Sequence, residues 1–404
     1  MTFLRLSPCR RFLFFGTTLS LIVSTSALCK ELSSAELGEL RKMASVYQMI
    51  NSEYVRPVDR VSVLASCMKG MLNSLDGQSM YLDREDFEAQ VKEPSGDLVG
   101  IGVELGFRAG LPTVVAAVEG SPAASVGLRP KDYILEIDGQ PLEDREIKEA
   151  LRALQGRPGT QVRLTIRRPG ELESRILTVV RAPVAAKGIA SRMVSKGIGY
   201  LRIPSFKEQT AYEVRAEFRK LLGAGPLRGL VLDLRNSPGG LLESSIEVAA
   251  MFLTTNAPVV STEGRLPESN QAWVANRDKL SSGRSVKQDD WPEQMKTVPL
   301  TVLINGGTAS GSEIVAAALK DNDRAHLIGS KTFGRGTIQT VRMLDSGTAI
   351  KLTTAVFKTP SGRQLAGQGL DPDESAPDLL KLEDAGTDKD EGLRRAMDWL
   401  RIRS

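Results

Sequence analysis

The residues of this sequence whose types and spacing suggest chemistry begin with Ser310, in the segment NGGTASGSE. An apolar run precedes this segment and a helical pattern follows it, so Ser310 is expected at the mouth of a helix beginning near Ser312. Backbone N–H groups at a helix N-terminus have no partner within the helix and can stabilise an oxyanion. Gly311 offers the first such N–H, and Gly239 or Gly240 in LRNSPGG offers the second. The chemistry indicated is attack by a serine oxygen on a carbonyl carbon.

Ser310 also fits a purely structural role. The four residues Ser310-Gly311-Ser312-Glu313 form the S-x-x-E pattern of a capping box, in which the serine only caps the helix. The segment is neither a G-x-S-x-G elbow nor a P-loop, since no G-K-[ST] follows. The local pattern alone therefore favours capping over catalysis.

Histidine and cysteine usage narrows the chemistry further. The only histidine, His326, follows a helix and enters the apolar run of DRAHLIG, which is typical of a packed imidazole. One histidine, with Cys29 and Cys67 far apart in the chain, cannot build the usual zinc site. No metal, no cofactor and no disulfide framework are expected. Cys67 lies in an apolar helical run and is expected in the core as a small residue.

The elements that must position Ser310 alternate between strand and helix from residue 185 onward. Buried strands are expected in GIGYLRIPSF, GLVLDLRNSPGG and VPLTVLING, with helices between them, and this order predicts a largely parallel sheet. Sites in such sheets form at the carboxyl ends of strands, which brings loops 234–240 and 305–313 together. The polar stretch from Glu263 to Gln294 is either a lid or a solvated loop.

Residues 95–183 show a different organisation, with short strands, two helices and a glycine-rich opening. The helix in GSPAASVGL carries its own boundaries, with Ser121 as N-cap, Pro122 in the first turn and Gly127 past its end. A strand turn is expected at Asp138-Gly139. This order resembles a PDZ domain of the bacterial protease type.

The PDZ resemblance implies a peptide site at the GIG stretch. In that family a backbone nest holds a peptide C-terminus while the peptide adds to the sheet edge. The alternative is that Gly100 and Gly102 only relieve crowding in a small barrel. The matching positions are Val99, Gly100, Ile101, Gly102 and Val103.

The first 27 residues have the composition of a secretory signal. Three arginines precede an apolar run from residue 12 to residue 23, which is too short to span a bilayer. Small residues lead to Ala27, after which cleavage fits the small-x-small pattern. The alternatives are a retained N-terminal anchor and a lipoprotein site at Cys29, although Leu28 is larger than the residue that usually precedes such a cysteine. The body of the chain is therefore expected to be exported.

Length, charge and composition describe a soluble globular chain of several domains. The chain has 404 residues, of which 41% are apolar and 25% are charged. Without the three arginines of the signal, the formal charge of +4 falls to +1, which gives no support for nucleic-acid binding. The pattern of residues 28–94 predicts an amphipathic helical region. Its apolar face is expected either to pack within the chain or to form the contact of a homo-oligomer such as a dimer.

Several dispersed motifs together resemble the C-terminal processing peptidases, also called tail-specific proteases. The motifs are GMLNSLDGQSMYL, LDLRNSPGG, ASGSEIVAAALKDNDRAHLIGSKTFGRGTIQT, KTPSGR and GLDPD, in this order along the chain. The resemblance implies an α/β (α+β multi-domain) protein with an N-terminal helical segment, a PDZ-like domain and a crotonase/ClpP-like α/β protease core at 184–404. It also implies an exported serine endopeptidase, in the bacterial periplasm or on the outer side of a membrane, that binds apolar C-termini of proteins and cuts with a Ser-Lys dyad.

Carried onto this sequence, the resemblance makes Ser310 the nucleophile and Gln339 the residue that orients the base. The family's base is the lysine of T-F-G-K-G, but this chain reads T-F-G-R-G and places Arg335 there, 25 residues after Ser310. Arginine has a pKa above ~12, so fewer than about one side chain in 10⁵ is neutral at pH 7.

Other candidate bases and two functions stay open. Lys331 lies about 13 Å from position 335 along an extended strand, too far without rearrangement. Glu313 and His326 could act only if the fold brings them to Ser310. The chain is accordingly either a serine endopeptidase with a non-standard Ser-Arg pair, or a proteolytically impaired scaffold or adaptor that binds protein C-termini through its PDZ domain.

Overall fold

The computed structural model describes residues 32–91, 98–108, 110–142, 147–184, 187–276, 291–344, 347–378 and 384–403. The predicted signal at 1–27, Cys29 and much of the polar stretch after Asn276 lie outside these ranges. The chain divides into two compact units, 1–66 and 67–404. Within the described ranges, no helix combines the length and apolar character needed to cross a membrane.

The N-terminal region is helical, as expected. Helix α1 (Ser34–Glu53) begins with a capping box, in which the Ser33 N–H donates to Glu36 Oε2 at 2.7 Å and the Glu36 N–H donates to Ser33 Oγ at 3.3 Å. Helix α2 (Arg60–Asn73) follows, and neither helix has a buried residue. The expectation that Cys67 is a core residue is therefore wrong: its side chain is exposed, because nothing in the described chain covers that face of α2.

The expectation of an all-helical segment as far as residue 91 needs one correction. A short strand, β1 (Met80–Leu82), precedes helix α3 (Arg84–Val91). It pairs with β18 (Ala349–Lys358), with Met80 opposite Lys351. This long-range pairing supplies the hydrogen bonds of a three-residue strand, which its own sequence does not signal.

The PDZ region forms an antiparallel sheet in the order β3-β4-β5-β7-β8, with β6 paired to β5. Strand β3 is an edge strand, and helix α5 lies against it. The predicted N-cap at Ser121 and the turn at Asp138-Gly139 are confirmed, the turn residues having φ of +51° and +77°. The elements are β2 (Leu98–Gly100), β3 (Val103–Arg108), β4 (Leu111–Ala117), α4 (Pro122–Ser125), β5 (Tyr133–Ile137), β6 (Gln140–Pro141), α5 (Ile147–Leu154), β7 (Gln161–Arg167), β8 (Arg175–Val180) and β9 (Ala182–Val184).

The expected parallel sheet is confirmed in the second half of the chain. Its strand order is β10-β11-β12-β15-β16-β19, and every neighbouring pair is parallel except β10 with β11. The strands are β10 (Ala190–Ser195), β11 (Ile198–Arg202), β12 (Gly229–Asp233), β15 (Leu300–Ile304), β16 (His326–Gly329) and β19 (Glu374–Ser375).

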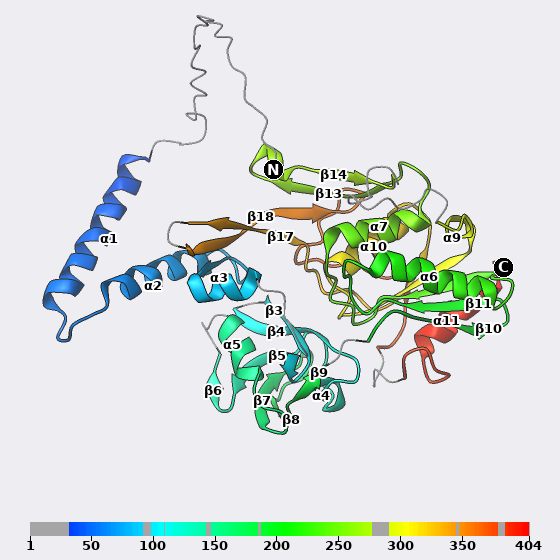
Figure 1. Ribbon diagram of the computed structural model, residues 1–404, viewed down its shortest axis with the longest axis horizontal. Helices are drawn as coiled ribbons and strands as arrows, with labels where there is room; N and C mark the ends of the chain where they lie inside the picture. The colour runs from blue at the N-terminus through cyan, green and yellow to red at the C-terminus, as the bar shows by residue number, and fades with distance from the viewer. Residues whose placement is uncertain are drawn as a thin grey trace, which may run out of the picture. The chain divides into compact units, whose positions relative to one another are not determined.

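Helices cover both faces of this sheet. Leu230 and Leu232 of β12 pack in one apolar cluster with α6 (Thr210–Gly223), α7 (Leu242–Phe252) and α10 (Gly311–Asp321). Val231, on the opposite face, packs in another with α11 (Glu391–Arg401). Figure 1 shows α6, α7 and α10 gathered beside the sheet. Burial on both faces explains why these strands are apolar throughout.

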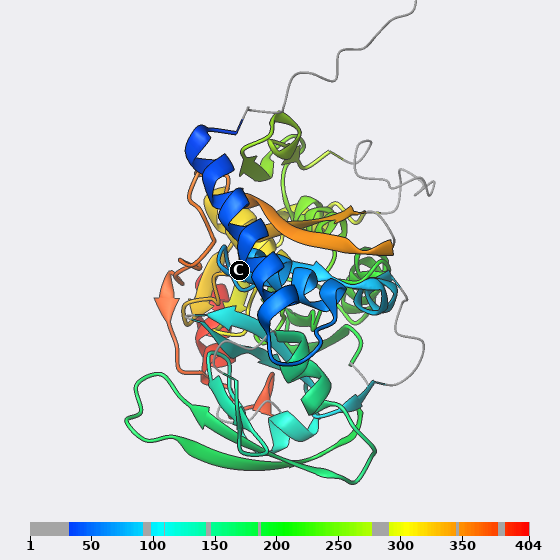
Figure 2. The ribbon, with the colours of Figure 1, turned by 90° about the vertical axis from the view of Figure 1, so that its left-hand side faces the viewer.

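A second, antiparallel sheet carries part of the site, and the sequence did not separate it from the first. Strand β18 lies at its centre, paired with β1, β13 and β17. The β17–β18 hairpin is long, and Figure 2 shows it in orange. The start of the polar stretch is a hairpin in the same sheet. The additional elements are β13 (Pro258–Gly264), η1 (Pro267–Ser269), β14 (Ala272–Val274), α9 (Gln294–Thr297) and β17 (Thr337–Met343).

Candidate active site

Ser310 has a backbone conformation that serine rarely adopts. It lies between β15 and α10 with φ +52° and ψ −118°. Such a residue costs about 1–3 kcal/mol and persists only where its surroundings enforce it, which is typical of active sites. The G-x-S-x-G motif is absent, yet the strained strand-to-helix turn that this motif produces is present. Strain at Ser310 is a signal of catalysis that the S-x-x-E pattern does not contain.

Three glycines in and beside this turn have neighbours so close that an added Cβ would clash. A Cβ on Gly311 would lie 2.2 Å from Ser245 Oγ, and a Cβ on Gly239 would lie 2.6 Å from the Gly311 nitrogen. Gly239 and Gly240 also have φ of +93° and +147°. A Cβ on Gly240 would lie 2.0 Å from the carbonyl oxygen of Phe206. The structure thus brings all three predicted oxyanion glycines to Ser310.

Their N–H groups remain available to a ligand. Around this loop, the Phe206 N–H donates to the Gly239 carbonyl at 2.9 Å and the Leu241 N–H donates to the Phe206 carbonyl at 2.8 Å. Among the described residues, no backbone carbonyl accepts from the N–H of Gly239, Gly240 or Gly311. Donors that point beside a serine oxygen and lack partners are what an oxyanion site requires.

Hydrogen bonds connect loop 234–240, which carries Gly239, to loop 305–313, which carries Ser310. The Ala309 N–H donates to the Ser237 carbonyl at 3.0 Å, and Ser312 Oγ donates to Ser237 Oγ at 2.7 Å. Thr308 Oγ1 donates to the Leu234 carbonyl at 2.8 Å. These contacts connect segments about 75 residues apart and hold Gly239 against Ser310.

Glu313 is buried, and its carboxylate supports the site through hydrogen bonds. Its Oε2 accepts the N–H groups of Ser310 and Arg335, each at 2.9 Å, and its Oε1 accepts the Gly334 N–H at 2.9 Å and the Thr332 hydroxyl. Burial raises the pKa of Glu313, and these four hydrogen bonds oppose the rise. A carboxylate has about four acceptor positions, so all are occupied. Glu313 therefore cannot serve as the base that Ser310 lacks.

Arg335 lies next to Ser310 in its backbone but directs its side chain away. The shared bonds to Glu313 Oε2 place the two backbone nitrogens side by side. The guanidinium instead reaches strand β3, where Nη1 lies 3.1 Å from Glu104 Oε1. The contact joins the predicted base position to the PDZ domain, and nothing in the sequence signals it, because 231 residues separate the partners.

The structure does not bring Gln339 to Arg335. The Gln339 amide donates to Thr337 Oγ1 at 2.9 Å and to Thr353 Oγ1 at 3.4 Å, within the β17–β18 hairpin. A bulge between Ile338 and Gln339 interrupts the pairing of these strands. A role for Gln339 in orienting a base has no contact to support it in this conformation.

His326 is a packed residue and not a base for Ser310. Its imidazole stacks on Trp399 of α11, with ring centroids 4.9 Å apart and planes 9° from parallel. It begins strand β16, whereas Ser310 follows the carboxyl end of the neighbouring strand β15. The interpretation of DRAHLIG as a packed histidine is confirmed.

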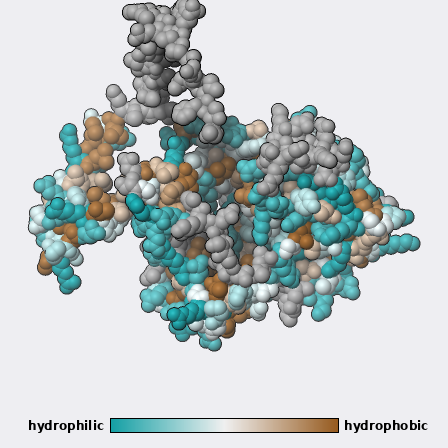
Figure 3. Space-filling model, viewed as in Figure 1, coloured by the Kyte–Doolittle hydropathy of each residue, from teal (hydrophilic) through white to brown (hydrophobic). Residues whose placement is uncertain are grey.

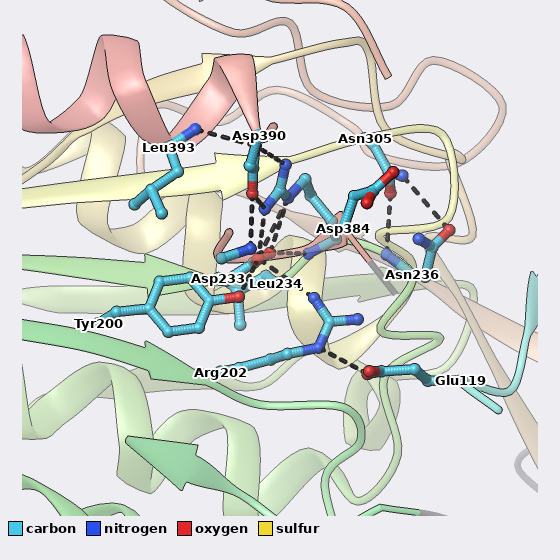
Figure 4. Close-up of polar contacts among 12 residues, drawn as sticks. Glu119, Tyr200, Arg202, Asp233, Leu234, Asn236, Asn305, Asp384, Asp390 and Leu393 are labelled. Atoms are coloured by element: carbon cyan, nitrogen blue, oxygen red, sulfur yellow. Dashed lines mark hydrogen bonds and ion pairs between the residues drawn. The ribbon is translucent and has the colours of Figure 1, made fainter. Parts of the chain in front are cut away.

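A buried ion network anchors the loop that carries Gly239. Arg235 Nη2 lies 2.6 Å from both Asp233 Oδ2 and Asp390 Oδ2, and Asp390 caps helix α11. Arg202 joins the same cluster through Asp233 at 3.1 Å and reaches Glu119 of the PDZ region at 3.2 Å (Figure 4). Burial alone would raise the pKa of Asp233, but the two arginines beside it hold the pKa well below its usual value.

In the predicted peptide nest, the carbonyl groups of Ile101 and Gly102 accept hydrogen bonds, whereas their N–H groups have no backbone acceptor among the described residues. The Ile101 carbonyl accepts the Ala123 N–H at 2.8 Å, and the Gly102 carbonyl accepts the Val118 N–H at 2.9 Å and Ser121 Oγ at 3.0 Å. The N–H groups of Ile101 and Gly102 have no backbone acceptor in the described part of the chain.

The other three residues of the nest belong to strands. Val99 and Gly100 lie in β2, opposite Pro183 and Ala182, and Val103 begins the edge strand β3. Gly102 has φ +74°, and a Cβ there would lie 2.3 Å from Ser121 Cβ, so packing requires glycine. The alternative that this glycine relieves crowding therefore also holds, and it is compatible with peptide binding.

Comparison with known proteins agrees with this geometry. Residues 197–376 match the model of peptidase family S41, residues 113–168 match a PDZ domain, and residues 22–86 match the N-terminal domain of the activating protease CtpB. A carboxy-terminal-processing protease of Bartonella bacilliformis is 34% identical over 371 residues, covering 90% of this chain and 82% of the relative. The chain belongs to peptidase family S41.

Two further relatives extend over the same length. The carboxy-terminal processing protease CtpA of Bacillus subtilis is 32% identical over 375 residues, covering 92% of this chain and 77% of the relative. The solved photosystem II D1 C-terminal processing protease has a TM-score of 0.70 and 26% identity, covering 88% of this chain and 97% of that structure. The S41 chain is thus a serine-type peptidase of the carboxyl-terminal processing kind, built on the expected fold with a PDZ domain.

Three residues of this S41 site were not identified from the sequence. Glu313 was noted only as a capping residue and a possible base, although its place in S-x-x-E was a usable signal. Ser245, which limits position 311 to glycine, lies in an ordinary helical pattern. Glu104 lies in a strand of the PDZ region, and no local pattern connects it to Arg335.

Proposed function

We propose that this chain is an exported endopeptidase that captures protein C-termini in its PDZ domain and cleaves peptide bonds with Ser310 as nucleophile. The observation that carries the proposal is the strained Ser310 turn beside the N–H groups of Gly239, Gly240 and Gly311, which have no backbone acceptor among the described residues. A capping serine needs none of these features. Together they suit a serine oxygen that attacks a carbonyl whose developing negative charge is stabilised at once.

Substrate capture follows from the PDZ geometry. An extended peptide can add to the edge strand β3, with its carboxylate accepting the N–H groups of Ile101 and Gly102. Apolar C-terminal side chains suit this site, because Ile101 belongs to the apolar cluster of the PDZ region and helix α5 contacts β3. Peptide or protein substrates with apolar C-termini are therefore the proposed partners.

Deprotonation of Ser310 limits the rate. Position 335 holds the lysine in the family pattern that the sequence resembles, but an arginine cannot accept the serine proton at neutral pH. Glu313 is saturated and His326 is packed against Trp399. Loss of an essential base typically costs several orders of magnitude, with residual catalysis from the oxyanion site. We accordingly propose slow turnover for the wild-type chain.

A second candidate function is peptide binding without turnover, as a scaffold or adaptor. The Arg335–Glu104 ion pair favours it, since the base position is engaged with the PDZ domain and not with Ser310. Export to a periplasm, or to the outer side of a membrane, is proposed from the N-terminal segment for both functions.

A homo-oligomer through the N-terminal helices is also part of the proposal. The supporting observation is apolar exposure on α1, where Leu37, Leu40, Met43 and Val46 are each more than 40% exposed. Brown patches over the helices in Figure 3 mark this apolar surface. Faces of this kind commonly mark protein contacts.

The test is cleavage of an unstructured reporter protein with an apolar C-terminus by the wild-type chain and by Ser310→Ala. Slow wild-type cleavage, abolished in Ser310→Ala, is expected. An otherwise identical reporter with an amidated C-terminus should be cut less efficiently, through a higher KM. Tight binding of the reporter with no cleavage by wild type would instead establish the scaffold function.

A further inference from the structure

A cavity beside Arg335 carries positive charge that its own lining residues do not neutralise. It has a volume of about 150 Å³ and lies between strand β3 and the segment from Phe333 to Thr337. Arg335 and Arg108 both line it, together with the aromatic rings of Phe107 and Phe333. No aspartate or glutamate is among its lining residues. Two guanidinium groups and two rings thus surround a space several water molecules in size.

Neither arginine is satisfied by its surroundings. The Arg108 side chain has no ion pair or hydrogen-bond partner among the described residues. The Arg335 side chain has one such partner in the described chain, Glu104, which reaches it from outside the cavity lining and contacts only Nη1. A guanidinium offers five donors in a planar fork, so both groups retain unused donors. The geometry of such a fork matches a carboxylate.

Lysines nearby respond to the same positive charge. Burial, and then the charge of Arg335, lower the pKa of Lys351, while Glu104 opposes the change. Burial, and then the charge of Arg108, lower the pKa of Lys131, while Asp378 and Glu313 oppose the change. The cations around the cavity therefore repel one another, and an added anion would relieve that repulsion.

The ion pair between Glu104 and Arg335 is weak. Its side chain is 46% exposed and that of Arg335 is 28% exposed, so water screens the pair. Glu104 also lies on β3, the edge strand to which a peptide can add. A carboxylate on an arriving peptide can therefore replace Glu104 at Arg335 at little cost.

We propose that this cavity is a carboxylate-binding subsite, in which Arg335 and Arg108 hold an acidic group of the peptide beside the edge strand β3. Arg335 then determines specificity in place of acting as a base. The proposal rests on the proposed function to the extent that the ligand is a peptide, but it requires no turnover. Two sources share this chemistry, an aspartate or glutamate side chain and a terminal carboxylate.

Binding to the full chain in the Ser310→Ala background tests the subsite without cleavage. The probes are fluorescein-labelled peptides with an apolar C-terminus, in pairs that carry aspartate or asparagine at successive internal positions, each as a free acid and as an amide. At one position, aspartate should bind about tenfold more tightly than asparagine, measured by fluorescence anisotropy. Arg335→Gln and Arg108→Gln should each remove most of this preference. Arg342→Gln, which changes an exposed arginine in strand β17, a few residues after Arg335, should leave it unchanged.

A further variant tests the role of Glu104. Because Glu104→Gln removes the internal competitor at Arg335, affinity for the aspartate peptide should rise by about 1.5- to fivefold. Affinity for the asparagine peptide should not change. Thermal melts of each variant establish that it is folded.

Each outcome separates this proposal from the proposed function. Equal binding of the aspartate and asparagine peptides at every position, or a preference that survives both arginine substitutions, would overturn the subsite while leaving PDZ capture intact. The arginine substitutions could instead remove the difference in affinity between peptides with acid and amide termini, and leave the difference between aspartate and asparagine peptides unchanged. In that case the subsite takes a terminal carboxylate. Failure of every peptide to bind would contradict both the subsite and the capture of C-termini.

Discussion

Replacing Arg335 by lysine is the substitution that most directly tests the account of catalysis. The Arg335 N–H is held by Glu313 beside Ser310, so Arg335→Lys keeps the backbone in place and changes only what the side chain can do. A neutral lysine amine can accept the Ser310 proton, whereas a guanidinium cannot. We expect Arg335→Lys to raise kcat/KM for the unstructured reporter.

The size of the increase follows from ionisation. An unperturbed lysine has a pKa of about 10.4 and that of arginine is about 2 to 3.4 units higher, so the neutral fraction at pH 7 rises by roughly 100- to 2,500-fold. The Lys351 cation lies within electrostatic range of position 335 and would repel a protonated lysine there. Glu104 acts in the opposite direction, and adding Glu104→Gln should contribute at most about a further fivefold.

The assay is kcat/KM between pH 6 and pH 10 for wild type, Arg335→Lys and the double variant with Glu104→Gln. The rate of Arg335→Lys should rise tenfold per pH unit until the introduced lysine is neutral. Ser310→Ala added to Arg335→Lys should abolish the gain. If Arg335→Lys is folded by thermal melting and is no faster than wild type across this range, position 335 is not the base position and the reasoning fails.

Three further predictions concern the framework of the site. Gly311→Ala places a Cβ 2.2 Å from Ser245 Oγ and should cost about 1–3 kcal/mol of stability with loss of any cleavage, whereas adding Ser245→Ala should recover part of the stability in urea unfolding. Asp390→Asn leaves Arg235 without one of its two buried carboxylates and should cost about 3–5 kcal/mol by the same measurement. The lowered pKa of Asp233 contributes stability above its unfolded pKa of about 3.9 that is lost progressively as pH falls below it, so Asp233→Asn should flatten the acid side of the stability profile.

Much of the fold was accessible from the sequence, because its signals are local. Apolar strands buried on both faces, the capping of α4 by Ser121 and the turn at Asp138-Gly139 each depend on a few neighbouring residues. The strand β1 and the antiparallel sheet around β18 were not predicted. The β1–β18 pairing joins segments more than 200 residues apart and the β13–β18 pairing joins segments about 90 to 100 residues apart, and no residue in either segment specifies the other.

The sequence by itself determined which functional groups the site contains. It placed Ser310 at a helix mouth, glycines in two loops and an arginine where the family pattern has lysine, since each of these depends on residue identity and spacing. Only the tertiary structure decided the conformation, the direction and the hydrogen-bond partners of these groups. The strain at Ser310, the saturation of Glu313 and the turn of Arg335 toward Glu104 arise from contacts between distant segments. A side chain's direction and partners depend on what the fold packs around it, and the linear order of residues does not specify that.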